Sequence, residues 1–112
     1  MSTENNILLA EFMGYKKMHP ENSSLYNKST NHELYIEDSK YNSDWNWLME
    51  VVDKIKKTKD IEFNILSYMV EIIIHGNYSK SLIEIRYRDT GLTTKQAVYN
   101  ACIEFVKYYN NQ

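Results

Sequence analysis

The chain has 112 residues, of which 43% are hydrophobic and 25% charged, and its formal net charge at pH 7 is −2. This length suits one small domain, and the balanced composition indicates a globular protein that needs neither disulfides nor metal to fold. The slight acidic excess argues against general nucleic-acid binding, which depends on clustered lysine and arginine. The single cysteine, Cys102, excludes an intramolecular disulfide, and no stretch approaches the ~18 apolar residues of a membrane span.

The N-terminal segment predicts a short helix. It begins MSTENN, without the basic start and long apolar run of a secretory signal peptide, so we expect a cytoplasmic protein. An apolar cluster follows, for which Thr3 suits the N-cap and Gly14 the stop. We predict a helix over residues 4–13, which is too short to be stable unless it packs on the rest of the domain.

Residues 15–42 differ in composition from the rest of the chain. They contain the only proline, Pro20, together with many asparagines, serines and scattered tyrosines. A structureless loop of this length is uncommon in a compact domain unless it is functional or mobile. We predict a long polar, Tyr-rich loop over 15–42, in which residues 33–37 are the candidate for a third, edge strand.

The segment after this loop has the spacing of an amphipathic helix. Ser43 or Asp44 suits the N-cap, and the lysines at the far end would complement the helix dipole. Steps of three and four residues form an apolar stripe of Trp45, Leu48, Val52 and Ile55, with Met49 and Val51 beside it. We therefore predict a helix over residues 44–57 and expect Trp45 to lie in the core.

Two alternating runs then predict an antiparallel hairpin over residues 66–75 and 81–88. The first run is rich in β-branched residues and apolar on most of both faces. In the second, Ile83, Ile85 and Tyr87 alternate with Glu84, Arg86 and Arg88. A short polar connection around Gly76 joins them. The asymmetry predicts that the first strand is the more central one.

The last element is a helix over residues 93–109. Thr93 and Gln96 have the spacing of a capping box. Apolar residues then recur at helical intervals: Val98, Ala101, Cys102, Phe105, Val106 and Tyr109. Within this pattern we expect Cys102 to be a small buried hydrophobe and not a nucleophile. Together the elements predict an α+β fold in which a small antiparallel sheet packs with three helices.

Three segments of the chain share a pattern with one known family. They are AEFMGY (residues 10–15), WNWLM (residues 45–49) and KQAVYNACIEFVKYYN (residues 95–110). In this order they resemble the phage ABA-sandwich domains, a family of uncharacterised phage and prophage proteins. The resemblance implies an α-β-α layered fold and an origin in a mobile element, but no activity. The family reads Tyr-His-x-Ser-Trp-Asp-Trp-Leu-Met, whereas Asn42, Asp44 and Asn46 replace its His, Ser and Asp here.

No group of residues predicts catalysis. The three histidines, His19, His32 and His75, form no i, i+4 pair and lie beside no cysteine; a weak site in the loop is the only alternative to solvated side chains. Isolated glycines give no phosphate-binding loop, and serine nucleophile motifs are absent. Acidic pairs such as Glu71 and Glu84 are explained more simply by a solvated strand face. We expect a protein that is not an enzyme and has no cofactor and no metal.

Tyrosine is the unusual component, with 10 residues in the chain. Tyrosine provides a large, rigid contact area with a polar tip, which suits recognition surfaces. A compositional bias, visible also in the many Asn, Lys and Ile residues, explains the count equally well. If tyrosine serves recognition, the candidate partner-binding residues are Tyr15, Tyr26, Tyr35, Tyr41, Trp47 and Tyr78. For Trp47 a place at the edge of the core is an equal alternative.

The leading hypothesis is a small phage- or prophage-type accessory protein that acts as a non-enzymatic protein-binding module. More specifically, the hypothesis describes an inhibitor of a host enzyme or defence complex, of the anti-CRISPR kind. The alternative is a module that binds single-stranded DNA or RNA through Arg86 and Arg88 near Tyr87, although alternation places Tyr87 on the opposite face. A homodimer through an exposed hairpin edge is also compatible with the pattern, and no membrane partner is expected.

Overall fold

The computed structural model describes residues 2–17, 24–27, 32–58, 61–75 and 80–111. In chain order these residues form α1 (Ser2–Phe12), β1 (Lys16–Lys17), β2 (Ser24–Asn27), β3 (His32–Tyr35), the 3-10 helix η1 (Ile36–Asp38), α2 (Trp45–Lys56), β4 (Ile61–Ile65), β5 (Met69–Ile74), β6 (Lys80–Arg86) and α3 (Thr94–Asn110). Within the described residues, three α-helices pack with two antiparallel sheets of order β1-β2-β3 and β4-β5-β6. The predicted α+β class is confirmed.

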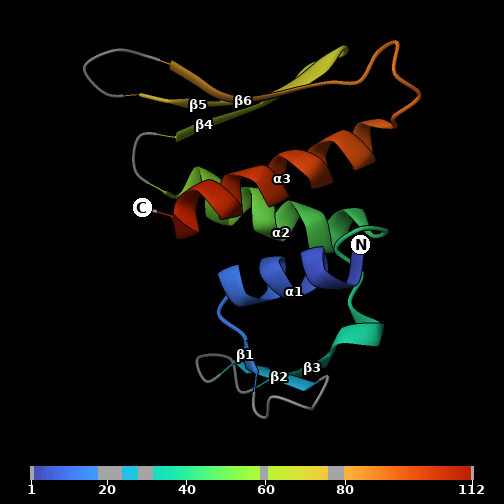
Figure 1. The fold of residues 1–112 in the computed structure, drawn as a ribbon, viewed down its shortest axis with the longest axis vertical. Helices are drawn as coiled ribbons and strands as arrows, with labels where there is room; N and C mark the ends of the chain where they lie inside the picture. Colours follow the sequence, from blue (N-terminus) through green and yellow to red (C-terminus); the bar gives the residue numbers. More distant parts are fainter. Residues whose placement is uncertain (1, 18–23, 28–31, 59–60, 76–79, 112) are drawn as a thin grey trace.

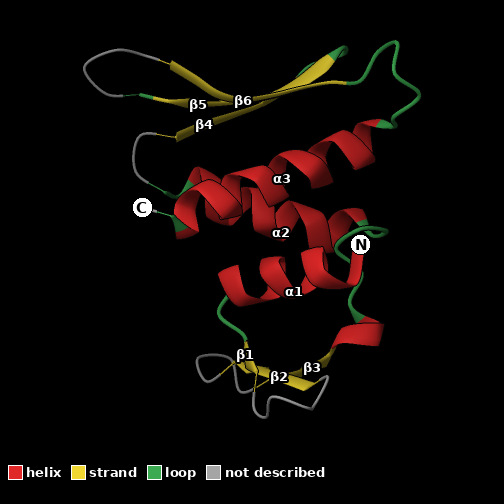
Figure 2. Ribbon diagram, viewed as in Figure 1, coloured by secondary structure: helices red, strands yellow, loops and turns green. Residues whose placement is uncertain are grey.

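The elements are arranged in layers (Figure 1). The β4–β6 sheet lies on α3 and α2, α1 lies beyond these two helices, and the β1–β3 sheet lies beyond α1. Figure 2 shows the same order by element type, with the helices between the two sheets. The α-β-α order implied by the family resemblance is therefore not the one observed, because the helices cover a single face of the β4–β6 sheet. The opposite face carries glutamates, and a helix packed there would have to bury their charges.

The β4–β6 sheet contains the predicted hairpin and one strand more. β5 and β6 pair antiparallel, with Glu71 opposite Glu84, and a bulge between Ile72 and Ile73 makes Leu82 an extra residue on β6. β4 pairs with the other side of β5, so β5 is the central strand, as the sequence predicted. Residues 66–68, which were predicted as part of the first strand, form the turn between β4 and β5 instead.

Strand β4 was missed because the turn that follows it contains Ser67 but none of the stronger turn residues glycine, proline, asparagine and aspartate. Hydrogen bonds close this turn instead. The amide of Leu66 donates to the carbonyl of Met69 (2.8 Å). The carbonyl of Leu66 accepts a hydrogen bond from the hydroxyl of Tyr87, whose side chain crosses from the end of β6. The turn is thus fixed by tertiary contacts, which a local sequence pattern does not reveal.

The segment predicted as a long loop over 15–42 carries the β1–β3 sheet and η1. The strand expected at 33–37 corresponds to β3, but it pairs with β2 and not with the hairpin. Leu25 of β2 and Leu34 of β3 are opposite each other, and both are buried in the core. These two leucines supply the apolar surface that holds the small sheet on the rest of the molecule.

Helix α1 is buried on both sides, and its C-terminus is closed by a Schellman motif. The amide of Tyr15 donates to the carbonyl of Ala10 (3.0 Å), and that of Gly14 donates to the carbonyl of Glu11 (3.1 Å). Gly14 has φ +105°, a left-handed conformation that costs glycine little. The predicted stop is confirmed, whereas the helix begins at Ser2, so Thr3 lies inside it and not at the N-cap.

Helices α2 and α3 begin as the sequence predicts. The carboxylate of Asp44 accepts a hydrogen bond from the amide of Asn46 (2.8 Å) at the N-cap of α2. The capping box of α3 is present, with Thr93 and Gln96 exchanging hydrogen bonds of 2.8 and 3.1 Å. Cys102 lies fully buried in α3, and burial raises the pKa of its thiol. It is therefore the buried hydrophobe that was expected.

Candidate functional site

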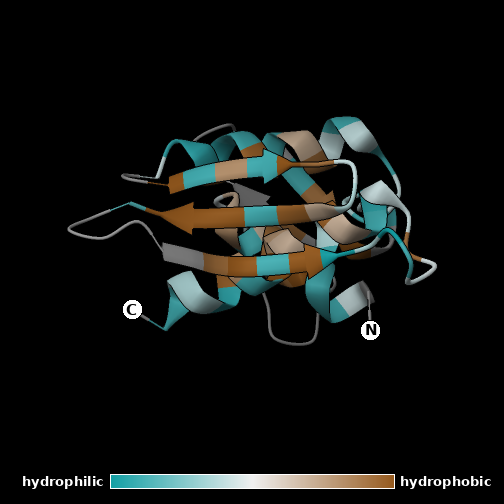
Figure 3. Cartoon of the chain, turned by 90° about the horizontal axis from the view of Figure 1, so that it is seen from above, coloured by the Kyte–Doolittle hydropathy of each residue, from teal (hydrophilic) through white to brown (hydrophobic). Residues whose placement is uncertain are grey.

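The helices leave the outer face of the β4–β6 sheet uncovered (Figure 3). Side chains alternate along each strand, so the residues that face outward can be derived from the pairing register. They are mainly polar: Glu62, Asn64, Glu71, His75, Glu84 and Arg86. No element in the described part of the chain covers these side chains.

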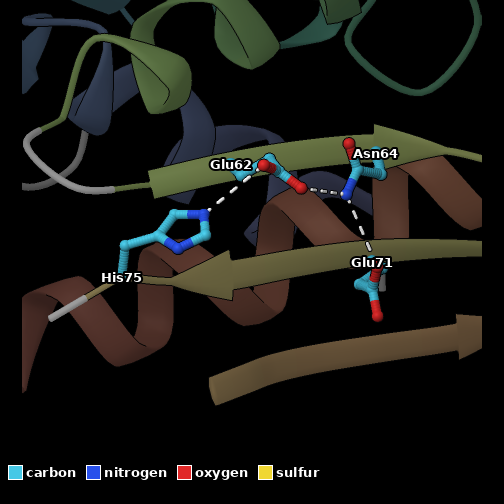
Figure 4. Close-up of polar contacts among 4 residues, drawn as sticks. All are labelled: Glu62, Asn64, Glu71 and His75. Atoms are coloured by element: carbon cyan, nitrogen blue, oxygen red, sulfur yellow. Dashed lines mark hydrogen bonds and ion pairs between the residues drawn. The ribbon is translucent and has the colours of Figure 1, made fainter. Parts of the chain in front are cut away.

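A chain of polar contacts crosses this face from β4 to β5 (Figure 4). The side-chain amide of Asn64 donates to Glu62 (2.7 Å) and to Glu71 (3.4 Å). Nε2 of His75 lies 3.4 Å from the other oxygen of Glu62. The hydrogen bond from Asn64, and then that from His75, hold the pKa of the Glu62 carboxyl below its usual value. Glu62 is therefore an anion at neutral pH.

This polar chain gives no support to acid–base catalysis. A general acid or base works best with a pKa near the working pH, whereas that of Glu62 is shifted away from neutrality. The side chains of His75 and Glu62 are also 43% and 49% exposed, whereas catalytic groups usually lie in a cleft. The simpler interpretation is an anionic surface with ordered side chains.

Like charges meet at the middle of this face. Glu71 and Glu84 are directly opposite each other on β5 and β6, an arrangement that is unfavourable in isolation. Arg86 is on the same strand as Glu84, and its Nη2 lies 3.8 Å from Oε2 of that residue. This ion pair therefore runs along one strand and not across to β5. The centre of the face remains acidic.

The end of the sheet beside the β4–β5 turn has a different character. Ile65, Leu66 and Tyr68 are exposed there to 41%, 37% and 41% of their surfaces, and we call these three residues the turn patch. Large apolar side chains that gather at one exposed turn are informative, whereas single exposed ones are common. The turn patch adjoins the cationic end of β6.

An open hollow of about 400 Å³ lies next to the turn patch, and we call it the cationic hollow. It is lined by Tyr68, Arg86, Arg88, Asp89 and Thr90. Backbone hydrogen bonds hold its walls together, because the carbonyl of Tyr68 accepts from the amides of Tyr87 (3.0 Å) and Arg88 (3.3 Å). Tyr68 thus belongs to both the turn patch and the cationic hollow, and it places an apolar side chain next to the two arginines.

Of the tyrosines predicted to bind a partner, the three whose side chains the structure describes, Tyr15, Tyr35 and Tyr41, are not all exposed. Tyr41 is buried, and desolvation, with smaller contributions from Tyr15 and Glu50, raises the pKa of its phenol. Its assignment to a binding surface is corrected, because the ring fills the core. Tyr15 is half-buried against the core, whereas Tyr35 is exposed at the end of β3.

Two further predicted residues are only partly described. Tyr26 lies in β2 opposite Lys16 and Glu33, and its side chain is outside the described part of the structure. Tyr78 lies outside the described residues altogether.

Trp45 does not lie in the core as predicted, and Trp47 lies at the edge of the core, one of its two predicted alternatives. Trp45, predicted in the core, is 40% exposed, whereas Trp47 is half-buried with its ring edge on Tyr41 (5.1 Å between centroids). Trp45 is the first residue of α2, where the helix has not yet reached the core, and Val51 completes the buried stripe instead. Trp47 is therefore a packing residue and not a free anchor for a partner.

A buried polar network connects α1, η1 and α3. Asn6 donates to Oγ of Ser39 and to Oδ1 of Asn42, each at 3.0 Å, and accepts from the hydroxyl of Tyr99 at 2.9 Å. An open pocket of about 270 Å³ beside it is lined by Asn42, Leu92, Gln96, Tyr99 and Asn100. Asn42, which replaces the histidine of the resembled family, is thus engaged in a structural hydrogen bond.

A second hollow, of about 330 Å³, lies where α1, α2 and α3 meet and is lined by Glu11, Phe12, Lys54, Tyr109 and Asn110. Nζ of Lys54 donates to the carbonyl of Phe12 and lies 4.8 Å from the centre of its ring. Lys54 thereby satisfies a carbonyl at the end of α1 and makes a cation–π contact. These contacts indicate that the hollow results from the way the three helices pack at their junction.

The described ranges contain no cluster of three or more His, Cys, Asp or Glu side chains suited to a metal ion. His19 is outside these ranges, as is the side chain of His32. Of the helices in the described part of the chain, none has both the length and the apolar character needed to cross a bilayer.

Comparisons of the chain with protein-family models, with curated proteins and with solved structures gave no match. The candidate site therefore rests on its own geometry. Sequence reasoning noticed Arg86 and Arg88 but missed Leu66 and Tyr68, which were placed inside a strand. The available signal was the alternation of Ile61, Phe63 and Ile65 with polar residues, which marks β4 and leaves Leu66 in a turn.

Proposed function

We propose that this protein is a non-enzymatic protein-binding module whose binding surface is the turn patch together with the cationic hollow. One observation carries the proposal. Six large hydrophobic side chains are exposed in the described part of the chain, and three of them, Ile65, Leu66 and Tyr68, lie within four residues at one turn. One of the three, Tyr68, lines the cationic hollow together with Arg86 and Arg88. Apolar, tyrosine and arginine side chains side by side are the composition of interface hot spots.

The rigidity of the site supports the same function. The turn patch is fixed by the hydrogen bond between Leu66 and Met69 and by the hydroxyl of Tyr87. A surface that is already ordered loses little conformational entropy when a partner binds. The proposal therefore needs no rearrangement of the described fold.

The biological setting we propose is that of a phage- or prophage-encoded accessory protein that inhibits a host enzyme or defence complex. The supporting observation is the ordered resemblance of three segments to the phage ABA-sandwich domains. An inhibitor needs only a complementary surface, and the turn patch and cationic hollow would provide one without any catalytic group.

The test is affinity purification of the tagged protein from a phage-susceptible bacterial host, followed by mass spectrometry. Wild type, Tyr68→Ser and Trp45→Ser are compared, because the two aromatic residues are exposed to the same extent (41% and 40%) on different parts of the molecule. We expect a stoichiometric protein partner that is lost with Tyr68→Ser and retained with Trp45→Ser. Recovery of no stoichiometric partner by the wild type would remove the main support for the proposal.

One observation favours the alternative function, which is binding of single-stranded nucleic acid. Tyr68, and not Tyr87, lines the cationic hollow with Arg86 and Arg88, so an aromatic ring for stacking and two cations lie together. Tyr87 packs toward the core, as alternation predicted. Fluorescence anisotropy with single-stranded DNA and RNA over a salt series tests this alternative, and absence of binding at low salt ends it.

A further inference from the structure

Resting on the proposed function, we infer that the segment bound at this site is an acidic stretch of protein. One or two of its carboxylates pair with Arg86 and Arg88 in the cationic hollow. An apolar side chain next to them packs on the turn patch.

The two arginines are available for such a partner. The contact of Arg86 with Glu84 spans 3.8 Å, and its side chain remains 69% exposed, so this surface ion pair contributes little. Arg88 is exposed and forms no ion pair with any residue in the described part of the chain. A guanidinium presents donors in a fixed fork that matches a carboxylate, so each arginine suits bidentate recognition of Asp or Glu.

The charge pattern of the rest of the sheet favours a short acidic segment over a nucleic acid. Glu84, Glu71 and Glu62 continue along the same face from the hollow, and they would repel a phosphate chain laid over the sheet. Asp89 also lines the hollow and limits the negative charge that it can accept. One or two carboxylates fit these limits, whereas a run of phosphates does not.

The turn patch adds the second element of recognition. Tyr68 is shared by the turn patch and the hollow, and Leu66 lies two residues before it in the same turn. Burial of such side chains supplies affinity, whereas charged groups at the rim mainly supply specificity and association rate. A partner segment in which acidic and apolar residues are neighbours would engage both features at once.

The experiment selects short random peptides, displayed on yeast, for binding to the purified full-length protein. Wild type is compared with R86Q/R88Q and with the control K56Q/K57Q, which removes two exposed cations from the end of α2 and so changes the net charge equally. We expect wild type and K56Q/K57Q to enrich peptides that combine Asp or Glu with apolar residues. The enriched peptides should bind R86Q/R88Q at least about tenfold more weakly.

Three further measurements make the outcome decisive. R86K/R88K, which keeps the charge but loses the forked geometry, should lose part of the affinity, and Leu66→Ser should weaken the same peptides. Thermal unfolding checks that each variant is folded. Enriched peptides without acidic residues, or equal affinity for R86Q/R88Q, would overturn the inference, as would tight binding of single-stranded oligonucleotides in place of peptides.

The inference and the proposed function fail in different ways. If affinity purification recovers a protein partner that R86Q/R88Q retains, protein binding stands and the acidic segment is excluded. If no partner is recovered and no peptide is enriched, both the protein-binding function and the acidic segment are excluded.

Discussion

The two sheets lie on opposite sides of the helices, and they are attached to them in different ways. The β4–β6 sheet has strands of five, six and seven residues, and its central strand buries Val70 and Ile72 on the side of α3. The β1–β3 sheet has strands of two, four and four residues, and among its described side chains Leu25 and Leu34 are buried. The β4–β6 sheet therefore packs on the helices along a continuous face, whereas the β1–β3 sheet is attached through two buried leucines, Leu25 and Leu34.

The two modes of attachment determine how stability is distributed over the molecule. A sheet with a continuous buried face opens only when the whole core opens, whereas a small sheet with few apolar contacts can open locally. The proposed binding surface belongs to the more firmly packed sheet, which keeps the turn patch and the cationic hollow ordered.

The largest expected effect is that of Ile72→Ala. Ile72 is fully buried at the centre of β5, so the substitution should lower the free energy of unfolding by about 3–4 kcal/mol, measured by urea denaturation. The matched control is Ile73→Ala, the next residue, whose side chain points to the outer face and should cost about 1 kcal/mol. Equal losses for the two variants would contradict the packing of this sheet.

Leu25→Ala tests the other side of the comparison. Leu25 is also fully buried, but the small sheet around it can rearrange, so we expect a loss of about 2 kcal/mol, at the low end for such a substitution. Hydrogen exchange should quicken in β1–β3 while the amides of β5 keep their protection. If exchange quickened equally in both sheets, the two would unfold as one unit and the comparison would fail.

The two tryptophans of α2 test how helix packing differs between a residue that contacts the segment after the small sheet and one that is largely exposed. Trp47 contacts Tyr41, which follows the small sheet in the chain, so Trp47→Ala should cost about 1–2 kcal/mol through the lost aromatic contact. Trp45→Ala should change stability by less than about 0.5 kcal/mol, because its side chain is largely exposed. Thermal unfolding of both variants measures the difference, and a larger loss for Trp45→Ala would reverse the assignment.

The last expected effect concerns alkaline pH on the α1 side of α3. Desolvation by burial raises the pKa of Tyr99 from 10.0 to about 12. The folded state therefore favours the neutral phenol, so its contribution is complete below pH 10 and is lost as the pH rises toward about 12. Tyr99→Phe should reduce the fall in unfolding free energy over this range, measured by urea denaturation at increasing pH.

Tyr99→Phe also removes the hydrogen bond to Asn6, so stability at neutral pH should fall by about 1 kcal/mol. Burial raises the pKa of Tyr41 as well, so part of the alkaline loss should persist in the variant. An alkaline profile identical to that of the wild type would show that Tyr99 is not responsible.

The sequence predicted the elements whose pattern is complete within one segment. The stripe of α2, the capping box at Thr93 and the alternation in β6 each span enough residues to show their period. The strands of the small sheet are too short to show one, and they form because Leu25 and Leu34 reach the core. The contacts of these two leucines with the core join distant parts of the chain, so a local sequence pattern does not predict them.

The candidate site could be predicted only in part, for the same reason. Arg86 and Arg88 were visible as the polar positions of an alternating strand. Tyr68 joins them because the β4–β5 turn is closed by Tyr87, a contact that sequence spacing does not contain. Counting tyrosines could not separate Tyr41 in the core from Tyr35 on the surface, because burial depends on where the chain folds back.

The bulge in β6 has a consequence for how selective this protein can be. β6 is the last strand of its sheet, and the extra residue Leu82 distorts it near its start. Together with the charges of Glu84 and Arg86, this distortion makes the edge a poor template for another strand. Backbone pairing is open to almost any extended peptide, so discouraging it limits indiscriminate addition of strands, including those of a second copy. Discrimination among partners is then left to side chains, which differ from one sequence to the next.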